Sequence, residues 1–413
     1  MTQTNASIPL PLHLYRAATH LVPLIARRHI DKRLRINKEH PERWTERLGQ
    51  PSADRPDGRL IWLHAVGLGE VLSLRGLVHR MADLSDAHFL ITSGTNAAGK
   101  ALGDNMPPRT QHQFLPLDAP YYRAAFLDHW RPDLCVWAEQ DIWPGFVLDC
   151  HARGIPQAHV VSRMTAQSWR KKLRFAAAYR YIYGRMRLIT TYDRNTQRLL
   201  KSFGVTGAPI TGPIKPTAPP LQCDADELAR MRAVLGDRFV WITAPSHPAD
   251  EALARAAHAR LRAQRPDALL IIAPRYPRRE FAFDEPHAVR SRGEMPGPEH
   301  QIYLADTFGD LGLLYRLARA ALIGGTNDDV EGHSPWEAIN LGTAILHGPR
   351  VKNFKADYAE LHMAGAAQRV TTPDMIVAAL TGDLDARISK GEKALAGYRA
   401  ATDALARDLL ALV

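Results

Sequence analysis

Short apolar runs alternate with amphipathic helical patterns along most of the chain. Each run is followed by a polar turn and then by a helical pattern, as at Val71–Leu84. This alternation is typical of parallel sheets covered by helices. We therefore predict an α/β fold with a doubly wound domain in each half. The predicted strands are Leu60–Ala65, His88–Thr92, Leu134–Ala138 and Gln157–Val161, then Phe239–Thr243, Leu269–Ala273, Ala320–Gly324 and Ala344–Leu346.

A proline-rich segment separates the two halves. Ala208–Leu221 contains five prolines, and proline continues neither a helix nor a central strand, so this segment reads as a semi-rigid linker. We place the domain boundary near Gly212. Two such domains would leave a cleft between the carboxyl ends of their strands, where ligands bind in sheets of this kind. The predicted segments are an N-terminal membrane-surface segment with a lead-in helix (1–50), an N-terminal domain (51–212), a hinge (213–225), a C-terminal domain (226–388) and a final helix (389–413).

The N-terminal segment combines an apolar stretch with a basic one. Leu10–Ala26 is apolar but interrupted by His13, Arg16 and His20, and it falls short of the roughly 20 apolar residues that cross a bilayer. Two interpretations are open: a segment that lies on an anionic membrane, or a helix packed on its own domain. No small-residue cleavage site follows, so we do not expect a secretory signal. The basic residues that follow are Arg27, Arg28, Lys32, Arg33, Arg35 and Lys38.

Composition narrows the functional classes. The 413 residues are 46% hydrophobic and 23% charged, as in an ordinary globular protein of two domains. The net charge of +10 favours a polyanionic partner: nucleic acid, an anionic membrane or a phosphorylated substrate. Zinc-finger spacing and aromatic RNA-binding signatures are missing from the sequence, so nucleic acid is not expected. The three cysteines lack CxxC spacing and predict buried thiols in a reducing compartment.

Two acidic motifs follow predicted strands of the first half. In His64–Glu70 (HAVGLGE), Gly67 and Gly69 permit a tight turn, and Glu70 is either a general base or a complement to a helix N-terminus. In Glu139–Pro144 (EQDIWP), Asp141 is a candidate helix cap. Glu139 ends an apolar run, which favours a functional role.

A glycine-rich motif in the second half, Gly324–Glu337 (GGTNDDVEGHSPWE), precedes a predicted helix. Ser334, Pro335 and Glu337 fit a capping box with proline at the first helical position. The same helix N-terminus would also suit a phosphate. The adjacent Asp328 and Asp329 could be metal ligands or simply solvated side chains of a loop. We expect them to be solvated.

Two cations complete the candidates. Arg275 directly follows the strand Leu269–Ala273 and could bind a phosphate or a pyrimidine carbonyl. Lys215 lies in the proline-rich segment and would meet substrate only if that segment lines the cleft.

Taken in order, these motifs resemble the Kdo transferases (Kdo is 3-deoxy-D-manno-octulosonic acid), glycosyltransferase family 30. The family pairs two Rossmann-like domains in the GT-B arrangement and needs no metal. The likeness covers most of the chain. The segments that carry it are Arg43–Gly49, His64–Val71, Glu139–Pro144, Ala152–Pro156, Val161–Arg163, Ile210–Pro216, Ser246-His247, Pro274-Arg275, Asp306–Leu314, Gly332–Ala338 and Asn353-Phe354.

The resemblance implies a role for each matching residue. Glu70 matches the proton acceptor, and Glu139 and Lys215 match positions that stabilise the transition state. The family's three CMP-binding segments correspond to Pro274 and Arg275, then Gly309, Asp310 and Leu311, then Ser334, Pro335, Trp336 and Glu337.

The resemblance also implies a reaction. It is the inverting transfer of Kdo from CMP-Kdo to a lipid A precursor in lipopolysaccharide synthesis, without cofactor or metal. The expected place is the cytoplasmic face of a bacterial inner membrane, whose anionic surface is a further partner. An anionic leaving group and an oxocarbenium-like transition state suit cations on one side and a carboxylate on the other.

Several positions depart from the family pattern. The family usually has histidine at Tyr276, asparagine at Ser334 and Pro213, and serine at Gly67. The loop Thr326–Glu331 replaces a more apolar segment. Three rival interpretations stay open: a paralogue with another CMP-activated acidic sugar or another acceptor, a non-catalytic membrane-associated binding protein, and a sugar-nucleotide epimerase.

Overall fold

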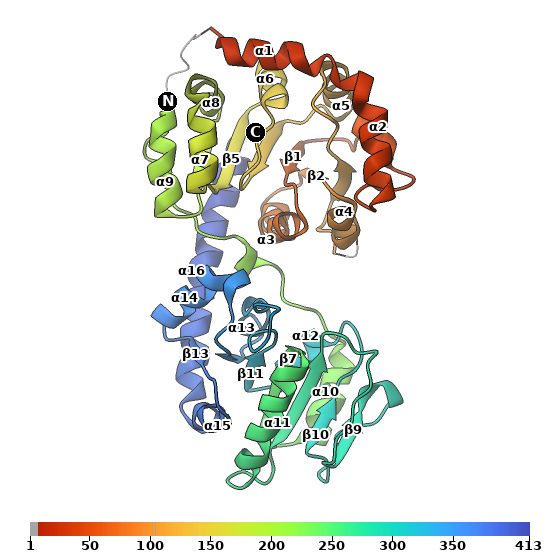
Figure 1. The fold of residues 1–413 in the computed structure, drawn as a ribbon, viewed down its shortest axis with the longest axis vertical. Helices are drawn as coiled ribbons and strands as arrows, with labels where there is room; N and C mark the ends of the chain where they lie inside the picture. The colour runs from red at the N-terminus through yellow and green to blue at the C-terminus, as the bar shows by residue number, and fades with distance from the viewer. Residues whose placement is uncertain (1–6, 104) are drawn as a thin grey trace. The chain divides into compact units, whose positions relative to one another are not determined.

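The computed structural model describes residues 7–103 and 105–413, so residues 1–6 of the predicted N-terminal segment lie outside it. The chain divides into two compact units (Figure 1). Unit 1 runs to Pro219 and includes Tyr398–Val413, and unit 2 is Pro220–Gly397. The division falls after Pro219, within the proline-rich segment.

Unit 1 is built on a six-stranded sheet in the order β3-β2-β1-β4-β5-β6, with every neighbouring pair parallel. Its strands are β1 (Leu60–His64), β2 (His88–Ser93), β3 (Thr110–Phe114), β4 (Leu134–Ala138), β5 (Gln157–Ser162) and β6 (Leu188–Thr191).

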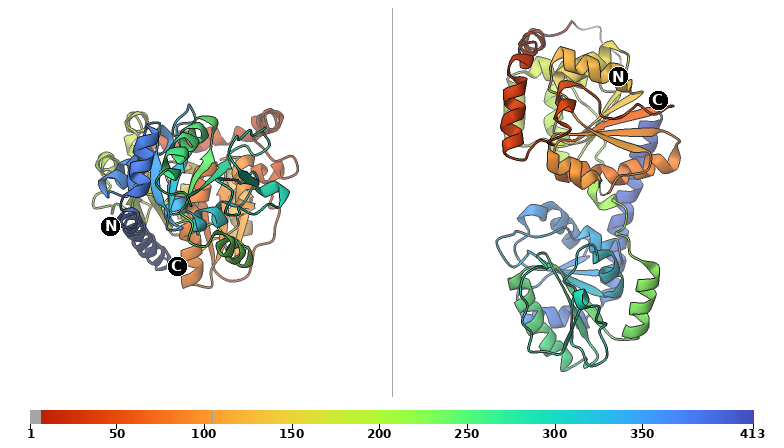
Figure 2. Two further views of the ribbon diagram at one scale, coloured as in Figure 1. Left: turned by 90° about the horizontal axis from the view of Figure 1, so that it is seen from below. Right: turned by 90° about the vertical axis from the view of Figure 1, so that its right-hand side faces the viewer.

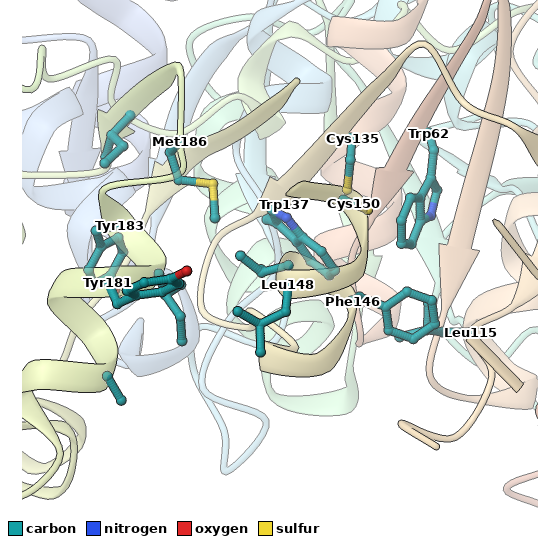
Figure 3. Close-up of a cluster of buried hydrophobic side chains, with 14 of the residues drawn as sticks. Trp62, Leu115, Cys135, Trp137, Phe146, Leu148, Cys150, Tyr181, Tyr183 and Met186 are labelled. Atoms are coloured by element: carbon teal, nitrogen blue, oxygen red, sulfur yellow. The ribbon is translucent and has the colours of Figure 1, made fainter. Parts of the chain in front are cut away.

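Apolar side chains on both faces of this sheet are buried. Along β1, Leu60 and Trp62 join one hydrophobic cluster while Ile61 and Leu63 join another. Successive side chains of a strand point to opposite faces, so helices must cover both. In the first cluster the rings of Trp62 and Trp137 meet edge to face at 5.4 Å (Figure 3).

The helices of unit 1 include the N-terminal pair α1 and α2. They are α1 (Leu10–Thr19), α2 (Val22–Arg35), α3 (Leu68–Leu84), α4 (Asn96–Gly103), α5 (Pro120–Trp130), α6 (Pro144–Ala152), α7 (Ala166–Leu173), α8 (Ala176–Tyr183) and α9 (Arg194–Leu200), with 3-10 turns η1 (Trp44–Leu48), η2 (Lys201–Phe203) and η3 (Lys215–Thr217).

The lead-in segment contains a buried ion pair and is hydrogen-bonded to the rest of unit 1. Glu39 accepts hydrogen bonds from Arg33 and Arg47, and Arg47 also donates to the backbone oxygen of Leu115 at 2.7 Å. Leu12 of α1 and Ala26 of α2 are buried in hydrophobic clusters with residues of the domain, so one face of each helix packs on it, as one of the two interpretations requires. Over the described part of the chain, no helix is both long and apolar enough to cross a bilayer. Five large apolar side chains of α1, α2 and the turn between them are nevertheless exposed: Leu10, Leu14, Leu21, Leu24 and Ile25.

Unit 2 has a seven-stranded parallel sheet in the order β13-β12-β11-β7-β8-β10-β9. As in unit 1, helices pack outside the strands (Figure 2). Its strands are β7 (Val240–Ser246), β8 (Leu269–Pro274), β9 (His287–Val289), β10 (Ile302–Leu304), β11 (Ala320–Ile323), β12 (Ala344–His347) and β13 (Ala367–Arg369). Its helices are α10 (Ala225–Leu235), α11 (Pro248–Arg262), α12 (Leu311–Leu317), α13 (Trp336–Ile339), α14 (Lys355–Met363) and α15 (Pro373–Thr381), with turns η4 (Arg290–Arg292) and η5 (Lys352–Phe354).

The final helix, α16 (Leu384–Leu410), begins five residues earlier than the predicted 389. Its C-terminal part belongs to unit 1, where Leu405, Ala406 and Leu409 pack in the same cluster as Leu74 of α3. This helix is therefore shared between the units rather than a separate appendage. The prediction of two doubly wound, parallel α/β domains is confirmed.

Candidate active site

The first acidic side chain of unit 1 lies in the opening turn of α3. Oε2 of Glu70 accepts hydrogen bonds from the backbone N–H groups of Val66 and Gly67, both at 3.1 Å. Glu70 thus complements the helix N-terminus, one of its two predicted roles, and does so with a single oxygen. Gly67 is extended at φ −93°, and a side chain at Gly69 would meet open space, so the turn does not require glycine at either position.

Glu139 follows β4 in a strained backbone conformation. Its φ of +58° is unusual for a residue with a side chain and costs about 1–3 kcal/mol. Backbone bonds fix it: its N–H donates to Val160 O at 3.1 Å, and its carbonyl accepts from Arg163 N at 3.0 Å. Strained residues of this kind cluster at functional sites, so the backbone supports the functional interpretation of Glu139.

Electrostatics link Glu139 to the other predicted residues of unit 1. Burial and the negative charge of Glu70 raise the pKa of Glu139, while Arg163, a hydrogen bond from Ser73 and the charge of Lys215 oppose the rise. Lys215 lies in η3, near the end of the first of the two stretches of chain that form unit 1. The structure therefore brings Glu70, Glu139 and Lys215, from three separate segments, into one electrostatic cluster.

Asp141 belongs to the same cluster but does not cap a helix. Burial and the charge of Glu70 raise its pKa, and Lys172 opposes the rise. The next helix, α6, has Trp143 at its N-cap and no side-chain hydrogen bond there. The capping role considered for Asp141 is therefore wrong.

Unit 2 contains a cavity of about 340 Å³ at the carboxyl end of its sheet. Seven of the nine residues predicted to bind CMP line it: Pro274, Arg275, Gly309, Asp310, Leu311, Ser334 and Glu337. The other two, Pro335 and Trp336, are buried beside it, where Trp336 Nε1 donates to Asp357 at 2.7 Å.

Arg275 and His333 form the nitrogen-rich part of the lining. Burial, together with His247 and the charge of Arg275, lowers the pKa of His333 to about 4, so its ring is neutral at physiological pH. Its Nε2 shares a hydrogen bond with Nε2 of His247 at 3.0 Å. Arg275 is thus the cationic side chain of this pair.

A tight loop before α12 forms another wall. Gly309 has φ +92°, a conformation that side chains rarely adopt. Asp310 accepts from Thr307 and, at 2.8 Å, from Nη2 of Arg290. Burial alone would raise the pKa of Asp310, but these hydrogen bonds outweigh it and lower the value. The carboxylate of Asp310 therefore holds the loop in shape.

The predicted capping box at Ser334 is wrong. Helix α13 is a single turn of four residues with Pro335 at its N-cap and no side-chain cap. One turn carries little macrodipole, so the helix N-terminus is a weaker phosphate site than predicted. Gly342, at φ +77°, ends the segment soon afterwards.

The glycine-rich loop is instead organised by Asp250 of α11. This buried carboxylate accepts from Gly325 N at 2.7 Å, Asn327 Nδ2 at 2.8 Å and His247 N at 3.1 Å. Gly324 passes so close to Pro245 that a Cβ atom would lie 1.8 Å from its carbonyl oxygen. Glycine at this position therefore serves close packing of the loop against β7.

The side chains of the adjacent aspartates Asp328 and Asp329 both have partners within the protein. Asp328 accepts from Val330 N at 3.0 Å, and Asp329 pairs with Arg350. Within residues 7–103 and 105–413, no group of three or more His, Cys, Asp or Glu side chains is placed to hold a metal ion.

Several lining residues were missed by sequence reasoning: Pro245, Ala273, Thr307, Phe308, Leu314, His333 and Phe354. Phe308 could have been identified from the sequence. It stands between Thr307 and Gly309 in a loop, where an aromatic side chain is not expected to be part of the hydrophobic core. Thr307, Leu314, His333 and Phe354 lie in segments that carried the family resemblance but were given no role. The remaining two, Pro245 and Ala273, belong to β7 and β8, and only their position in the fold reveals them.

Two parallel α/β units, one with an acidic cluster and one with a cavity that Arg275 lines, are consistent with the class of glycosyltransferases. Residues 42–218 match the family model of 3-deoxy-D-manno-octulosonic-acid transferase (kdotransferase). A probable mitochondrial 3-deoxy-D-manno-octulosonic acid transferase of Arabidopsis thaliana is 30% identical, over 86% of this chain and 82% of that protein. The chain belongs to the Kdo transferase family.

Bacterial relatives extend the comparison. The Haemophilus influenzae enzyme is 27% identical over 86% of this chain and 87% of its own length. The Rickettsia prowazekii enzyme is 30% identical over 70% of this chain, which spans only 64% of that relative.

Solved structures show more distant likeness. The C-terminal CMP-Kdo binding domain of WaaA from Acinetobacter baumannii is 24% identical with a TM-score of 0.37, covering 43% of this chain and 96% of that domain. A UDP-GlcNAc 2-epimerase from Neisseria meningitidis is 12% identical with a TM-score of 0.49, covering 86% of this chain and 99% of that protein.

Proposed function

We propose that this protein transfers Kdo from CMP-Kdo to the hydroxyl of a lipid A precursor, with inversion at the anomeric carbon. Family membership supports the sugar and the transfer. The observation that carries the assignment is that one chain contains both the Glu70 cluster, in unit 1, and the Arg275 cavity, in unit 2.

The donor is assigned to the cavity of unit 2. Its volume of about 340 Å³ falls in the range of small-molecule sites. Arg275 supplies a permanent positive charge with several N–H donors, which suits the donor phosphate. As the bond between the anomeric carbon and the phosphate oxygen breaks, negative charge grows on the departing CMP. The guanidinium of Arg275 stabilises this charge. The proposed reaction is one without a metal, in which Arg275 stabilises the leaving group.

The base is assigned to Glu70. Its Oε2 is held by two backbone N–H groups, which orients the carboxylate and leaves Oε1 to accept the proton of the acceptor hydroxyl. The oxygen then bonds to the anomeric carbon as CMP leaves from the opposite face. Displacement in one step inverts that carbon. Lys215 and Glu139 stabilise the charge that develops around the reacting groups.

The acceptor and the membrane are assigned to unit 1. The exposed apolar side chains Leu21, Leu24 and Ile25 lie beside Arg27 and Arg28, so apolar and basic groups occur together on the N-terminal helices. Such a surface suits the headgroup region of an anionic bilayer. We therefore place the protein at the cytoplasmic face of a bacterial inner membrane, where a lipid acceptor is presented.

Mass spectrometry of the acceptor tests the proposal. The purified protein is incubated with CMP-Kdo and a lipid A precursor, and the acceptor is expected to gain the mass of one or more Kdo residues. Unchanged acceptor mass would refute the assignment. Product formed only with a different CMP-activated sugar would identify a paralogue, and altered donor without acceptor would identify an epimerase.

A further inference from the structure

We propose that Phe308 is a stacking platform for the pyrimidine ring of the nucleotide donor, an inference that rests on the proposed function. Phe308 lines the cavity of unit 2 while 68% of its surface is exposed. Among the phenylalanines of the described chain, only Phe308 and Phe175 are exposed. An aromatic ring left in water beside a cavity offers a free face to a ligand.

The exposure of Phe308 does not come from an unrestrained loop, because the residues on both sides of it are fixed. Before it, Asp306 accepts from Ser291 N at 2.9 Å and from Ser291 Oγ at 2.6 Å. After it, Asp310 accepts from Arg290 at 2.8 Å. The ring is therefore presented on a pre-organised turn, so little ordering is needed when a ligand binds.

The turn that holds Phe308 is also hydrogen-bonded to other parts of unit 2. Arg290 donates to Asp310 and, at 2.7 Å, to Glu227 of α10. Thr307 donates to Asp310 across the turn that holds Phe308. These bonds tie the cavity wall to a helix outside the sheet.

The position of the ring relative to Arg275 suits a nucleotide. β8 and β10 are parallel neighbours, and Arg275 follows β8 while Phe308 follows β10. Both therefore extend from the same edge of the sheet. A nucleoside monophosphate could place its phosphate on the guanidinium and its flat base on the phenyl ring.

Base stacking explains the residue type better than contact with the sugar. A pyrimidine has a π face that matches an aromatic side chain, whereas an eight-carbon acidic sugar carries hydroxyls and a carboxylate that prefer polar partners. The cavity offers such partners in Arg275, Ser334 and Glu337.

Calorimetric titration with CMP alone tests the proposal. Phe308→Ala is expected to weaken CMP binding about 10- to 100-fold, in keeping with the usual effect of removing an aromatic partner from a base. Phe308→Tyr should keep the affinity within about threefold, because it retains the ring. Phe175→Ala, the loss of the other exposed phenylalanine, should leave CMP binding unchanged.

The outcomes separate this inference from the proposed function. If the unaltered protein does not bind CMP, the proposed function fails. If it binds CMP and Phe308→Ala binds equally well, the stacking role is wrong and the function stands. If Phe308→Ala raises the KM for CMP-Kdo but leaves CMP affinity unchanged, the ring contacts the sugar, which also overturns the proposal. Equal melting temperatures of the variants show that folding is unaffected.

Discussion

The hydroxyl of Ser73 lies 3.3 Å from Oε1 of Glu139 and 2.6 Å from the backbone oxygen of Glu70. A hydroxyl has one proton to donate, and the shorter contact is to the backbone oxygen of Glu70. The longer contact to Glu139 is therefore the weaker of the two. It lowers the pKa of Glu139, but burial and the charge of Glu70 outweigh it, and the pKa is raised.

Replacing Glu139 with glutamine should raise thermal stability at alkaline and neutral pH. The raised pKa means that the folded protein holds the proton more tightly than the unfolded chain, so stability falls as pH rises through the interval between the two values. Glutamine is uncharged at every pH and removes this loss. Melting temperatures measured at pH 8 and pH 4 should differ between the proteins only at pH 8. Exposed Glu42→Gln is the control, and a Glu139→Gln protein that is less stable at pH 8 would contradict the electrostatic account.

Replacing Glu70 with glutamine should slow transfer at least 100-fold, because general base catalysis typically contributes 10²- to 10⁴-fold. The amide oxygen can still accept the N–H groups of Val66 and Gly67, so the helix start should be preserved. CMP affinity should not change, because the cavity residues belong to unit 2. Rates at saturating substrates check this, and activity within threefold of the unaltered protein would exclude Glu70 as the base.

Replacing Arg275 with alanine should weaken CMP binding roughly tenfold or more, the usual effect of losing a charged hydrogen-bond partner. The affinity that remains should depend less on salt concentration, because one charge contact with the phosphate is gone. Titrations at low and high salt measure both effects. Arg278→Ala removes a nearby exposed arginine that does not line the cavity and serves as the control. Equal losses in the two variants would point to a general charge effect.

Replacing Leu24 with glutamate should reduce binding to anionic lipid vesicles about tenfold or more. Leu24 is 79% exposed on α2, and the change exchanges an apolar contact for a charge repelled by the lipid. Sedimentation with vesicles of phosphatidylglycerol and phosphatidylethanolamine gives the bound fraction. Met363→Glu, at an 84% exposed position of unit 2, makes the same kind of change away from the N-terminal helices. Equal binding by both variants would remove the membrane assignment from α1 and α2.

The central strands could be predicted from sequence because they are buried on both faces. Residues 134–138 (LCVWA) form an uninterrupted apolar run, and β4 has the predicted bounds. The edge strand β3 was missed, because its sequence, TQHQF, is polar and only its last two residues are buried. β9, β10 and β13 have three residues each, too few to show a pattern.

The candidate site shows a similar division. Motifs that directly follow strands, such as Arg275 after β8, could be placed from local sequence alone. The grouping of Glu70, Glu139 and Lys215 depends on how α3, the end of β4 and η3 pack together, and spacing along the chain does not contain that information. The Ser334 motif fitted a helix cap, but the structure has a helix of one turn with Pro335 at its N-cap, so the local capping pattern did not determine where the helix begins.

The most direct test counts both products of one reaction. Free CMP and Kdo-bearing acceptor are measured together over time, with CMP-Kdo and a lipid A precursor as substrates. The proposed displacement predicts one CMP released for each Kdo residue transferred, and no CMP above the spontaneous rate when the acceptor is omitted. Steady CMP release without acceptor, or release with no gain of Kdo on the lipid, would contradict it.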